Sequence, residues 1–286
     1  MKDRIFALIQ TLLPHHFLSS LMFKVTRIKV SWFKNFFIGK FITIYNVDMS
    51  QAQNENFTSY ESFNAFFTRP LKPTARPLAE GANTILSPVD GTVSEVGRIQ
   101  NDQVFQAKGK NFSLEKLVGG SPERAQFYRN GYFATLYLSP RDYHRIHMPI
   151  SGRIREMVHV PGRLFSVSPS TARSVNGLFA RNERVVAGFS TDAGPMAMIM
   201  VGAIFVSSME TVWAGTITPP RGNNLRQWSY DTQKPIHLDR ADEMGRFNMG
   251  STVILLFSEN SIQWNDDLKC GKKIQFGEKL GEIIKK

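Results

Sequence analysis

Cysteine and long hydrophobic runs are both scarce in this sequence. Cys270 is the only cysteine among 286 residues, which excludes an intramolecular disulfide and a cysteine-rich zinc site and favours a reducing compartment. The longest unbroken apolar stretch, 196–206, has 11 residues, well short of the ~20 that a membrane-spanning helix needs. No signal peptide is expected either, because the first apolar stretch is short and carries Asp3 and Arg4.

The net charge of +11 is unevenly distributed along the chain. Residues 1–45 hold seven basic side chains and one acidic side chain, a net charge of +6. Apolar residues repeat there at helical spacing, over 5–13 and again over 21–32, and predict two amphipathic helices. Lys24, Arg27 and Lys34 are expected on the polar side of the second helix. Trp32 and Phe36 add aromatic bulk that suits a lipid headgroup boundary.

Three kinds of partner suit this basic, amphipathic beginning. The helices can bind an anionic membrane surface, pack on the protein's own core, or bind nucleic acid through basic and aromatic side chains. Their apolar faces are broad for a segment that reads a nucleic-acid groove, and no recognition motif follows. We therefore predict an anionic membrane surface as the partner and no nucleic acid, with packing on the core as the alternative.

The amino-acid composition of the chain changes past residue 45. A polar and then proline-rich stretch predicts a linker and a short helix near 60–67, so we place a boundary at residue 46 between a helical segment (1–45) and the main domain (46–286). Short β-like runs dominate from residue 85 onward, among them 91–96, 133–138, 153–160 and 196–206. The predicted fold is α+β and mainly β, a strand-rich domain of β-sandwich or barrel type preceded by amphipathic helices.

Three short motifs place reactive side chains at turns beside predicted strands. Ser251 follows a glycine at the start of an apolar run, His144 and His147 precede a Pro-Ile-Ser-Gly turn, and Asp90 lies in Ser-Pro-Val-Asp-Gly. Each motif alone has a purely structural explanation, as a turn or as a histidine that packs locally. Together they supply the residue types of a charge relay, in which a carboxylate orients a histidine that deprotonates a serine. A metal site at His-x-x-His is a poorer interpretation, because further ligands are missing nearby.

These motifs resemble the phosphatidylserine decarboxylase family of the bacterial, membrane-associated type. Ser-Pro-Val-Asp-Gly, Tyr-His-Arg-x-His-x-Pro and Gly-Ser-Thr occur in that order, and DEMGRFNMGST is similar to the family's approach to its maturation site. The resemblance covers nearly the whole chain. This sequence departs from the family in having Met249 where Leu is usual and Arg240-Ala241 where Lys-Gly is frequent. Neither departure removes a reacting atom, and Met keeps the size and apolarity of Leu.

The resemblance implies a precursor that cuts itself between Gly250 and Ser251. The products would be a β chain of residues 1–250 and an α chain of residues 251–286 whose first residue, Ser251, becomes a pyruvoyl group. Asp90, His147 and Ser251 would form the self-cleavage triad. The pyruvoyl group would then be the cofactor, without pyridoxal phosphate or a metal, and would form a Schiff base with phosphatidylserine to give phosphatidylethanolamine and carbon dioxide. His144 is the candidate proton donor for that step.

The resemblance further implies where the protein works and with what. The substrate would be a lipid, the mature form an α–β heterodimer with further oligomerisation left open, and the location peripheral, on the cytoplasmic side of the cell membrane. Residues 1–45 would hold the main domain against an anionic leaflet. Two other functions stay open: a serine hydrolase that does not cut itself, although a Gly-x-Ser-x-Gly elbow is missing, and a membrane-bound carrier or scaffold.

Overall fold

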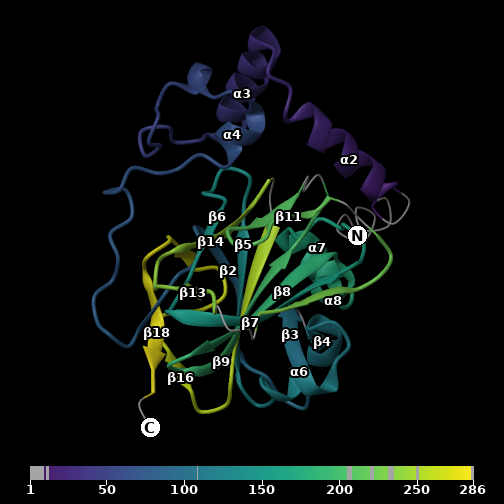
Figure 1. The fold of residues 1–286 in the computed structure, drawn as a ribbon, viewed down its shortest axis with the longest axis vertical. Helices are drawn as coiled ribbons and strands as arrows, with labels where there is room; N and C mark the ends of the chain where they lie inside the picture. The colour runs from purple at the N-terminus through teal and green to yellow at the C-terminus, as the bar shows by residue number, and fades with distance from the viewer. Residues whose placement is uncertain are drawn as a thin grey trace.

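The computed structural model describes residues 10, 13–107, 109–204, 208–219, 222–230, 235–248 and 251–284. A strand-rich body carries helices at one end, and the C-terminus lies at the opposite end (Figure 1). The helices are α2 (His15–Val25), α3 (Ser31–Tyr45), α4 (Phe63–Phe67), α5 (Leu114–Leu117), α6 (Pro122–Gln126), α7 (Pro169–Ser174) and α8 (Leu178–Arg181), with one 3₁₀ turn, η1 (Phe57–Ser59). None of the helices in the described ranges is both long and apolar enough to cross a bilayer.

The largest sheet holds the main core. Its antiparallel strands follow the spatial order β12 (Arg226–Ser229), β7 (Gly152–Val160), β8 (Arg184–Thr191), β9 (Gly194–Val201), β15 (Ser251–Phe257), β5 (Tyr132–Leu138), β2 (Gly91–Arg98) and β17 (Lys273–Ile274), and β13 (His237–Leu238) also pairs with β7. β15 lies inside this order, and all seven of its residues are buried. A strand buried on both faces requires a continuous apolar sequence, which residues 253–257 supply.

Smaller sheets complete the body. One follows the order β11 (Gly215–Thr218), β10 (Met209–Thr211), β14 (Glu243–Phe247) and β6 (Arg145–His147); another is β1 (Thr84–Leu86), β18 (Lys279–Ile283) and β16 (Ile262–Trp264); and β3 (Gln103–Ala107) pairs with β4 (Lys110–Ser113). No sheet formed by the described residues closes into a barrel. The prediction of a mainly β fold with N-terminal helices is confirmed, in the form of open antiparallel sheets.

The strands predicted from sequence are present with small changes in their bounds. The runs at 91–96, 133–138 and 153–160 are β2, β5 and β7. The apolar run at 196–206 is a strand only as far as Val201, where β9 ends. The helix expected near 60–67 is α4, which begins after Ser62, whose Oγ accepts a hydrogen bond from Ala65 N at 3.2 Å.

The helical end differs from the sequence prediction. The helix expected over 21–32 is interrupted, because α2 ends at Val25 and α3 begins only at Ser31. Within this break the carbonyl of Thr26 accepts a hydrogen bond from Asn64 N at 2.9 Å, so the turn between the two helices is joined to α4. The helix predicted over 5–13 lies almost entirely outside the described residues.

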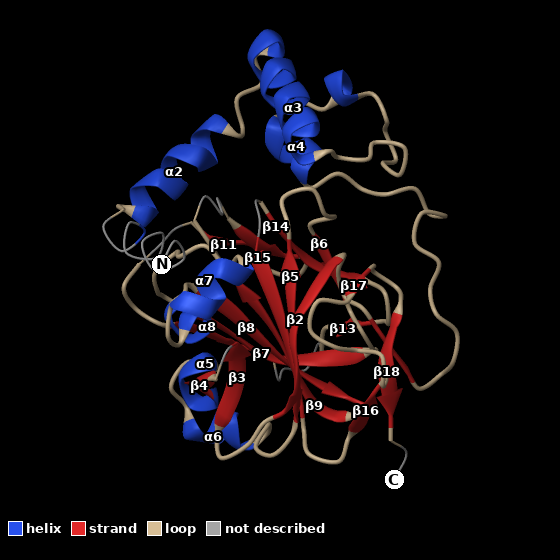
Figure 2. Cartoon of the chain, turned by 180° about the vertical axis from the view of Figure 1, so that it is seen from behind, coloured by secondary structure: helices blue, strands red, loops and turns tan. Residues whose placement is uncertain are grey.

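α3 and α4 form a small core of their own at this end of the molecule (Figure 2). Its buried members are apolar residues from both sides of the predicted boundary: Ile38, Phe41, Val47, Tyr60, Phe63, Phe66 and Phe67. Packing therefore continues across residue 46, and the division of the chain there stays a prediction. Lys34 is also buried rather than on an outer polar side, because its ammonium donates to Thr58 O and Asn35 Oδ1, each at 2.7 Å.

Candidate active site

Ser251 is the first residue of the buried strand β15. It lies opposite Leu138 in the neighbouring strand β5, and its side chain is completely inaccessible to solvent. Its Oγ has no hydrogen-bond partner within the described part of the chain. A buried hydroxyl without a partner is costly, and such groups are frequent where a side chain is kept for chemistry. Gly250, the other residue of the predicted cleavage site, lies outside the described residues, as does Met249.

His147 lies at the end of the short strand β6 and is held from several directions. Its amide donates to Pro88 O at 2.9 Å, and its ring stacks on Phe276 with the centroids 3.8 Å apart. Nδ1 is 2.8 Å from Ala241 O, and Nε2 is 3.0 Å from the hydroxyl of Tyr143. Because a carbonyl oxygen only accepts, Nδ1 carries the proton, and Nε2 of the neutral ring then accepts from Tyr143.

The surroundings of His147 favour this neutral form. Burial is the largest influence and lowers the pKa of His147, while the bond to Ala241 O and the charges of Glu243 and Asp90 act in the opposite direction. Burial also raises the pKa of Tyr143, so its hydroxyl stays protonated and able to donate. His147 is therefore a neutral base whose lone pair at Nε2 is occupied by Tyr143.

Asp90 is placed near His147 but is bonded to other groups. Its carboxylate makes a two-point ion pair with Arg76, at 2.9 Å from Oδ1 to Nε and 2.5 Å from Oδ2 to Nη2. Oδ1 also accepts from the amide of Phe276 at 2.8 Å. No hydrogen bond between Asp90 and His147 occurs among the described residues, and both nitrogens of His147 have other partners. Phe276 joins the two, since its amide binds Asp90 and its ring covers His147.

His144 is the second buried histidine of the motif and faces the helical end. Its Nδ1 lies 2.7 Å from Asp142 O, and its ring packs on Phe67 of α4 with the centroids 4.1 Å apart. Within the described chain its Nε2 has no partner. Burial lowers the pKa of His144 to about 3. His144 is thus neutral and, like Ser251, presents an unpaired polar atom inside the protein.

A small cavity at the helical end is lined by a neighbour of each of these two residues. It measures about 150 Å³ and includes Leu138, the residue opposite Ser251, and Phe67, the residue that packs on His144. Phe41 and Tyr45 of α3, together with Tyr137, add aromatic walls, and Ser166 and Ser168 add hydroxyl groups. Apolar walls with a few hydroxyl groups are typical of small-molecule sites.

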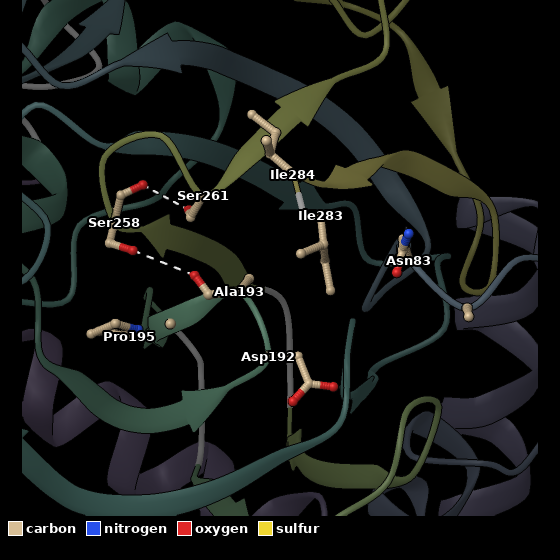
Figure 3. Close-up of a pocket in the computed structure, with 10 residues that line it drawn as sticks. Asn83, Asp192, Ala193, Pro195, Ser258, Ser261, Ile283 and Ile284 are labelled. Atoms are coloured by element: carbon tan, nitrogen blue, oxygen red, sulfur yellow. Dashed lines mark hydrogen bonds between the residues drawn. The ribbon is translucent and has the colours of Figure 1, made fainter. Parts of the chain in front are cut away.

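A larger cavity, about 600 Å³, lies elsewhere. Asp192, Ala193 and Pro195 line it together with Ser258 and Ser261, which follow the far end of β15 (Figure 3). Six residues of strand separate that end from Ser251, roughly 20 Å at ~3.4 Å per residue. Asp192 is the single titratable residue of its lining.

Asp90 and Tyr143 line a third cavity, of about 270 Å³. We regard the smallest of the three as the candidate active site because it is lined by Leu138, the residue opposite Ser251, and by Phe67, which packs on His144.

Several residues of this arrangement were not identified from the sequence. Arg76 comes from the proline-rich stretch, Phe276 from near the C-terminus, and Phe67 from α4; no local pattern links any of them to the histidines. Tyr143 directly precedes His144 and could have been suspected for that reason. No group of three or more His, Cys, Asp or Glu side chains in the described ranges is arranged to hold a metal ion.

Ser251 is sealed in a core strand, where the chain's own backbone lies within its reach and bulk solvent does not. This placement suits a protein that processes itself, and comparisons with known proteins agree with that class. The family model described as phosphatidylserine decarboxylase matches residues 63–282, and one described as PSD matches residues 5–46.

Comparison with relatives over their full length points to the same family. The chain is 53% identical over 283 residues to the phosphatidylserine decarboxylase proenzyme of Pseudomonas fluorescens, with 98% of both chains covered. It is 52% identical over 286 residues to that of Pseudomonas putida and 51% identical over 284 residues to that of Azotobacter vinelandii, with 99% of both chains covered in each case. The chain belongs to the phosphatidylserine decarboxylase family.

The contact between Tyr143 and His147 leads to a prediction about pH. The hydroxyl donates to Nε2 and so stabilises the neutral ring, and Tyr143→Phe removes this donor. We expect the pKa of His147 to rise by roughly one pH unit, since a hydrogen bond contributes ~1 kcal/mol and 1.36 kcal/mol corresponds to one unit. NMR titration of ¹⁵N-labelled histidine measures the change.

Tyr128→Phe is the matched control, because Tyr128 is also buried but lies in a different part of the core. Its removal should leave the titration of His147 unchanged. An unchanged pKa in the Tyr143 variant would contradict the assigned tautomer and the hydrogen bond to Nε2.

Proposed function

We propose that this chain is a phosphatidylserine decarboxylase that prepares its own pyruvoyl group by cutting the bond between Gly250 and Ser251. The observation that carries the proposal is Ser251 itself, whose buried hydroxyl lacks a partner in the described chain and directly follows the glycine. Family membership supports the activity and the proenzyme form. The serine-hydrolase and scaffold alternatives have no comparable support.

Self-cleavage needs a nucleophile, a base and a backbone that can bend. Ser251 Oγ would attack the carbonyl carbon of Gly250, and the acyl group would move from the nitrogen to the oxygen of residue 251. A glycine at position 250 leaves room for this rearrangement. A base then removes the Cα proton of residue 251, and elimination breaks the Cβ–O bond and releases a chain ending in the Gly250 carboxylate. Water then converts the remaining dehydroalanine into the pyruvoyl group and ammonia, so one water is consumed and one ammonia released.

His147 is the proposed base for the attack by Ser251. Its Nδ1 proton is fixed by Ala241 O, so Nε2 is the atom that accepts a proton. Tyr143 occupies this atom in the precursor and must move aside or pass the proton along. Asp90 would support the ring through Phe276 and through its negative charge, which favours the protonated histidine during the reaction.

A pyruvoyl group at position 251 would lie in this buried part of the core, near the cavity lined by Leu138. The buried Oγ of Ser251 makes no hydrogen bond to the described residues, which supports a reactive role for this atom. When present, the group supplies an electron sink for decarboxylation of an amine-bearing substrate. The apolar walls from Phe41, Tyr45 and Phe67 would exclude water from the reacting atoms.

His144 is the proposed residue that moves protons during decarboxylation. Its Nδ1 is bonded to a carbonyl and its pKa is about 3, so Nε2 in the resting state is a proton acceptor. A histidine with so low a pKa is a weak base but, once protonated, a strong acid, which suits donation of a proton to the carbon that has lost carbon dioxide.

We also propose that α2 and α3 contact the membrane surface from the cytoplasmic side. Their outward residues are apolar and highly exposed, with Phe17 at 67%, Trp32 at 74%, Phe36 at 63% and Ile44 at 71%. Trp32, Phe36 and Lys40 follow each other at a spacing of four residues and so share one face of α3. An exposed apolar surface next to cations suits an anionic bilayer better than water.

The faces of α2 support the same proposal. His15 and Ser19 are its buried residues, while Phe17 and Leu21 are exposed on the same helix as Lys24. A helix that merely covers a water-soluble core buries its apolar side chains, so the exposed Phe17 and Leu21 favour contact with a further apolar surface. A diacyl lipid leaves its bilayer with difficulty, at about 0.8 kcal/mol for each methylene, so an enzyme that acts on it benefits from docking.

The first prediction of the proposed function concerns Ser251. Ser251→Ala removes the nucleophile, so the variant should remain a single chain of 286 residues and form no phosphatidylethanolamine. Denaturing electrophoresis and mass spectrometry measure the cleavage. Ser261→Ala is the control, because Ser261 is also a buried serine whose hydroxyl is bonded to a backbone carbonyl, Ser258 O at 2.7 Å, and this variant should be cut. Cleavage of the Ser251 variant at the normal site would refute the assignment.

The second prediction separates the two histidines. His144→Ala should still undergo self-cleavage but decarboxylate at least ~100-fold more slowly, the usual contribution of a positioned acid or base. His147→Ala should lose self-cleavage itself. Cleavage extent and the carbon dioxide released per pyruvoyl group are measured in parallel. A His144 variant with normal turnover would remove this residue from the mechanism.

The third prediction concerns the membrane surface. The double variant Trp32→Ser, Phe36→Ser should bind vesicles of phosphatidylglycerol and phosphatidylcholine at least ~10-fold more weakly, since each buried aromatic contributes ~1.5 kcal/mol or more. Co-sedimentation measures the binding. Phe127→Ser is the control, because Phe127 is exposed but lies far along the chain, after α6. Equal binding of the double variant and the wild type would contradict the proposed surface.

A further inference from the structure

Asn248, which precedes residues 249 and 250, is held in place by several hydrogen bonds. Asn248 is completely buried. Its amide donates to Ser208 O at 3.0 Å, and its side-chain nitrogen donates to Glu210 Oε1 at 2.7 Å and to Ser208 Oγ. Just before it, Phe247 N donates to His144 O at 3.1 Å. The chain is thus anchored immediately before residues 249 and 250.

Ser251 anchors the chain on the other side of this gap, because it begins the fully paired strand β15. Three peptide units separate Asn248 from Ser251 and can span at most about 11 Å. The conformation of the Gly250 carbonyl therefore depends on where Asn248 is fixed. An error of about 1 Å at a reacting group can reduce a rate by ~100-fold.

The groups that fix Asn248 are themselves connected to helix α2. The guanidinium of Arg27, which follows the last turn of α2, donates from Nη2 to Ser208 Oγ at 3.3 Å and lies 3.9 Å from Glu210 Oε1. Arg27 is in turn held on the helix, with Nη1 3.2 Å from Phe23 O and the guanidinium 3.7 Å above the Phe23 ring. Both charged side chains are about three-quarters buried, which strengthens their interaction.

We propose that Asn248 is a positioning residue for self-cleavage and that Arg27, through Ser208 and Glu210, ties its position to helix α2. This inference rests on the proposed cleavage between Gly250 and Ser251. The basic N-terminal segment then has a second task besides membrane contact. Its Arg27 holds the carboxylate of Glu210 and the hydroxyl of Ser208 where Asn248 needs them, and so contributes to the geometry of the bond that is cut.

The contacts of Arg27 distinguish this task from membrane binding. Lys24, Lys29 and Lys40 have exposed side chains on the same segment, whereas Arg27 points into the protein and reaches β10 and its preceding residue. Burial lowers the pKa of Arg27, and the charge of Glu210 acts against this effect. A side chain that is partly desolvated and paired in this way suits fixing a structure better than binding a lipid headgroup.

The test follows self-cleavage of the newly synthesised full-length chain over time in a lipid-free, cell-free translation. We expect Glu210→Gln, Arg27→Gln and Asn248→Ala each to slow cleavage by about tenfold or more, while the midpoint of thermal unfolding stays close to that of the wild type. Arg27→Lys, which keeps the charge but loses the planar fork, should recover part of the rate. Arg129→Gln is the matched control, because it removes an Arg–Asp pair of 2.9 Å on another surface, and it should be cut at the normal rate.

A double variant tests the connection itself. If Arg27 acts through Glu210, then Arg27→Gln combined with Glu210→Gln should be little slower than the slower single variant. Multiplied rate losses would show that the two residues act independently and would overturn the proposal, as would wild-type rates in the single variants. Slow cleavage with a parallel loss of thermal stability in all variants would also overturn it, in favour of a general structural role. A wild-type chain that is never cut would instead refute the proposed function on which the inference rests.

Discussion

The complete burial of β15 is the constraint on which the rest of the molecule depends. This strand pairs with β9 on one side and β5 on the other, and its first residue is Ser251. Its position in the sheet fixes the serine without any hydrogen bond to the hydroxyl from the described residues. The segment after it continues into β16, β17 and β18, which pair with each other or with β1 and β2. A cut before Ser251 would leave the short chain bound to the long one by these strands.

The helices and the candidate active site share side chains. Phe41 and Phe67 belong to the small core of the helical end and also line the cavity beside Ser251, and Phe67 packs on His144. Helices that expose Phe17, Trp32 and Phe36 gain stability from a surface that accepts these side chains. The same elements would therefore close the site and bring it to the lipid, which removes the need to transfer a diacyl substrate through water.

Local patterns in the sequence were sufficient for several of the longer strands and for the reactive residue types. Apolar runs predicted β2, β5 and β7, and the order of the motifs singled out Asp90, His144, His147 and Ser251. Tertiary contacts decided the rest. The turn after Val25 is bonded to α4 through Asn64 N and Thr26 O, and the ammonium of Lys34 donates to Thr58 O. Periodicity carries no information about partners so distant in the chain.

Sequence patterns also failed to predict which groups the members of the proposed triad contact. Residue types suggested a direct contact between Asp90 and His147, whereas Asp90 is bonded to Arg76 and His147 to Ala241 and Tyr143. Whether these residues perform the proposed steps stays a prediction. Their protonation, however, follows from geometry, because each carbonyl contact fixes a proton on Nδ1 and leaves Nε2 as the acceptor in both histidines.

The intact mass of the purified protein under denaturing conditions tests the central claim most directly. Self-cleavage predicts two chains that meet at Gly250 and Ser251, the shorter one lighter by one ammonia than a serine-ended peptide and blocked to amino-terminal sequencing. A single chain with the mass of all 286 residues and an ordinary serine at position 251, unchanged after incubation with anionic vesicles, would contradict the account.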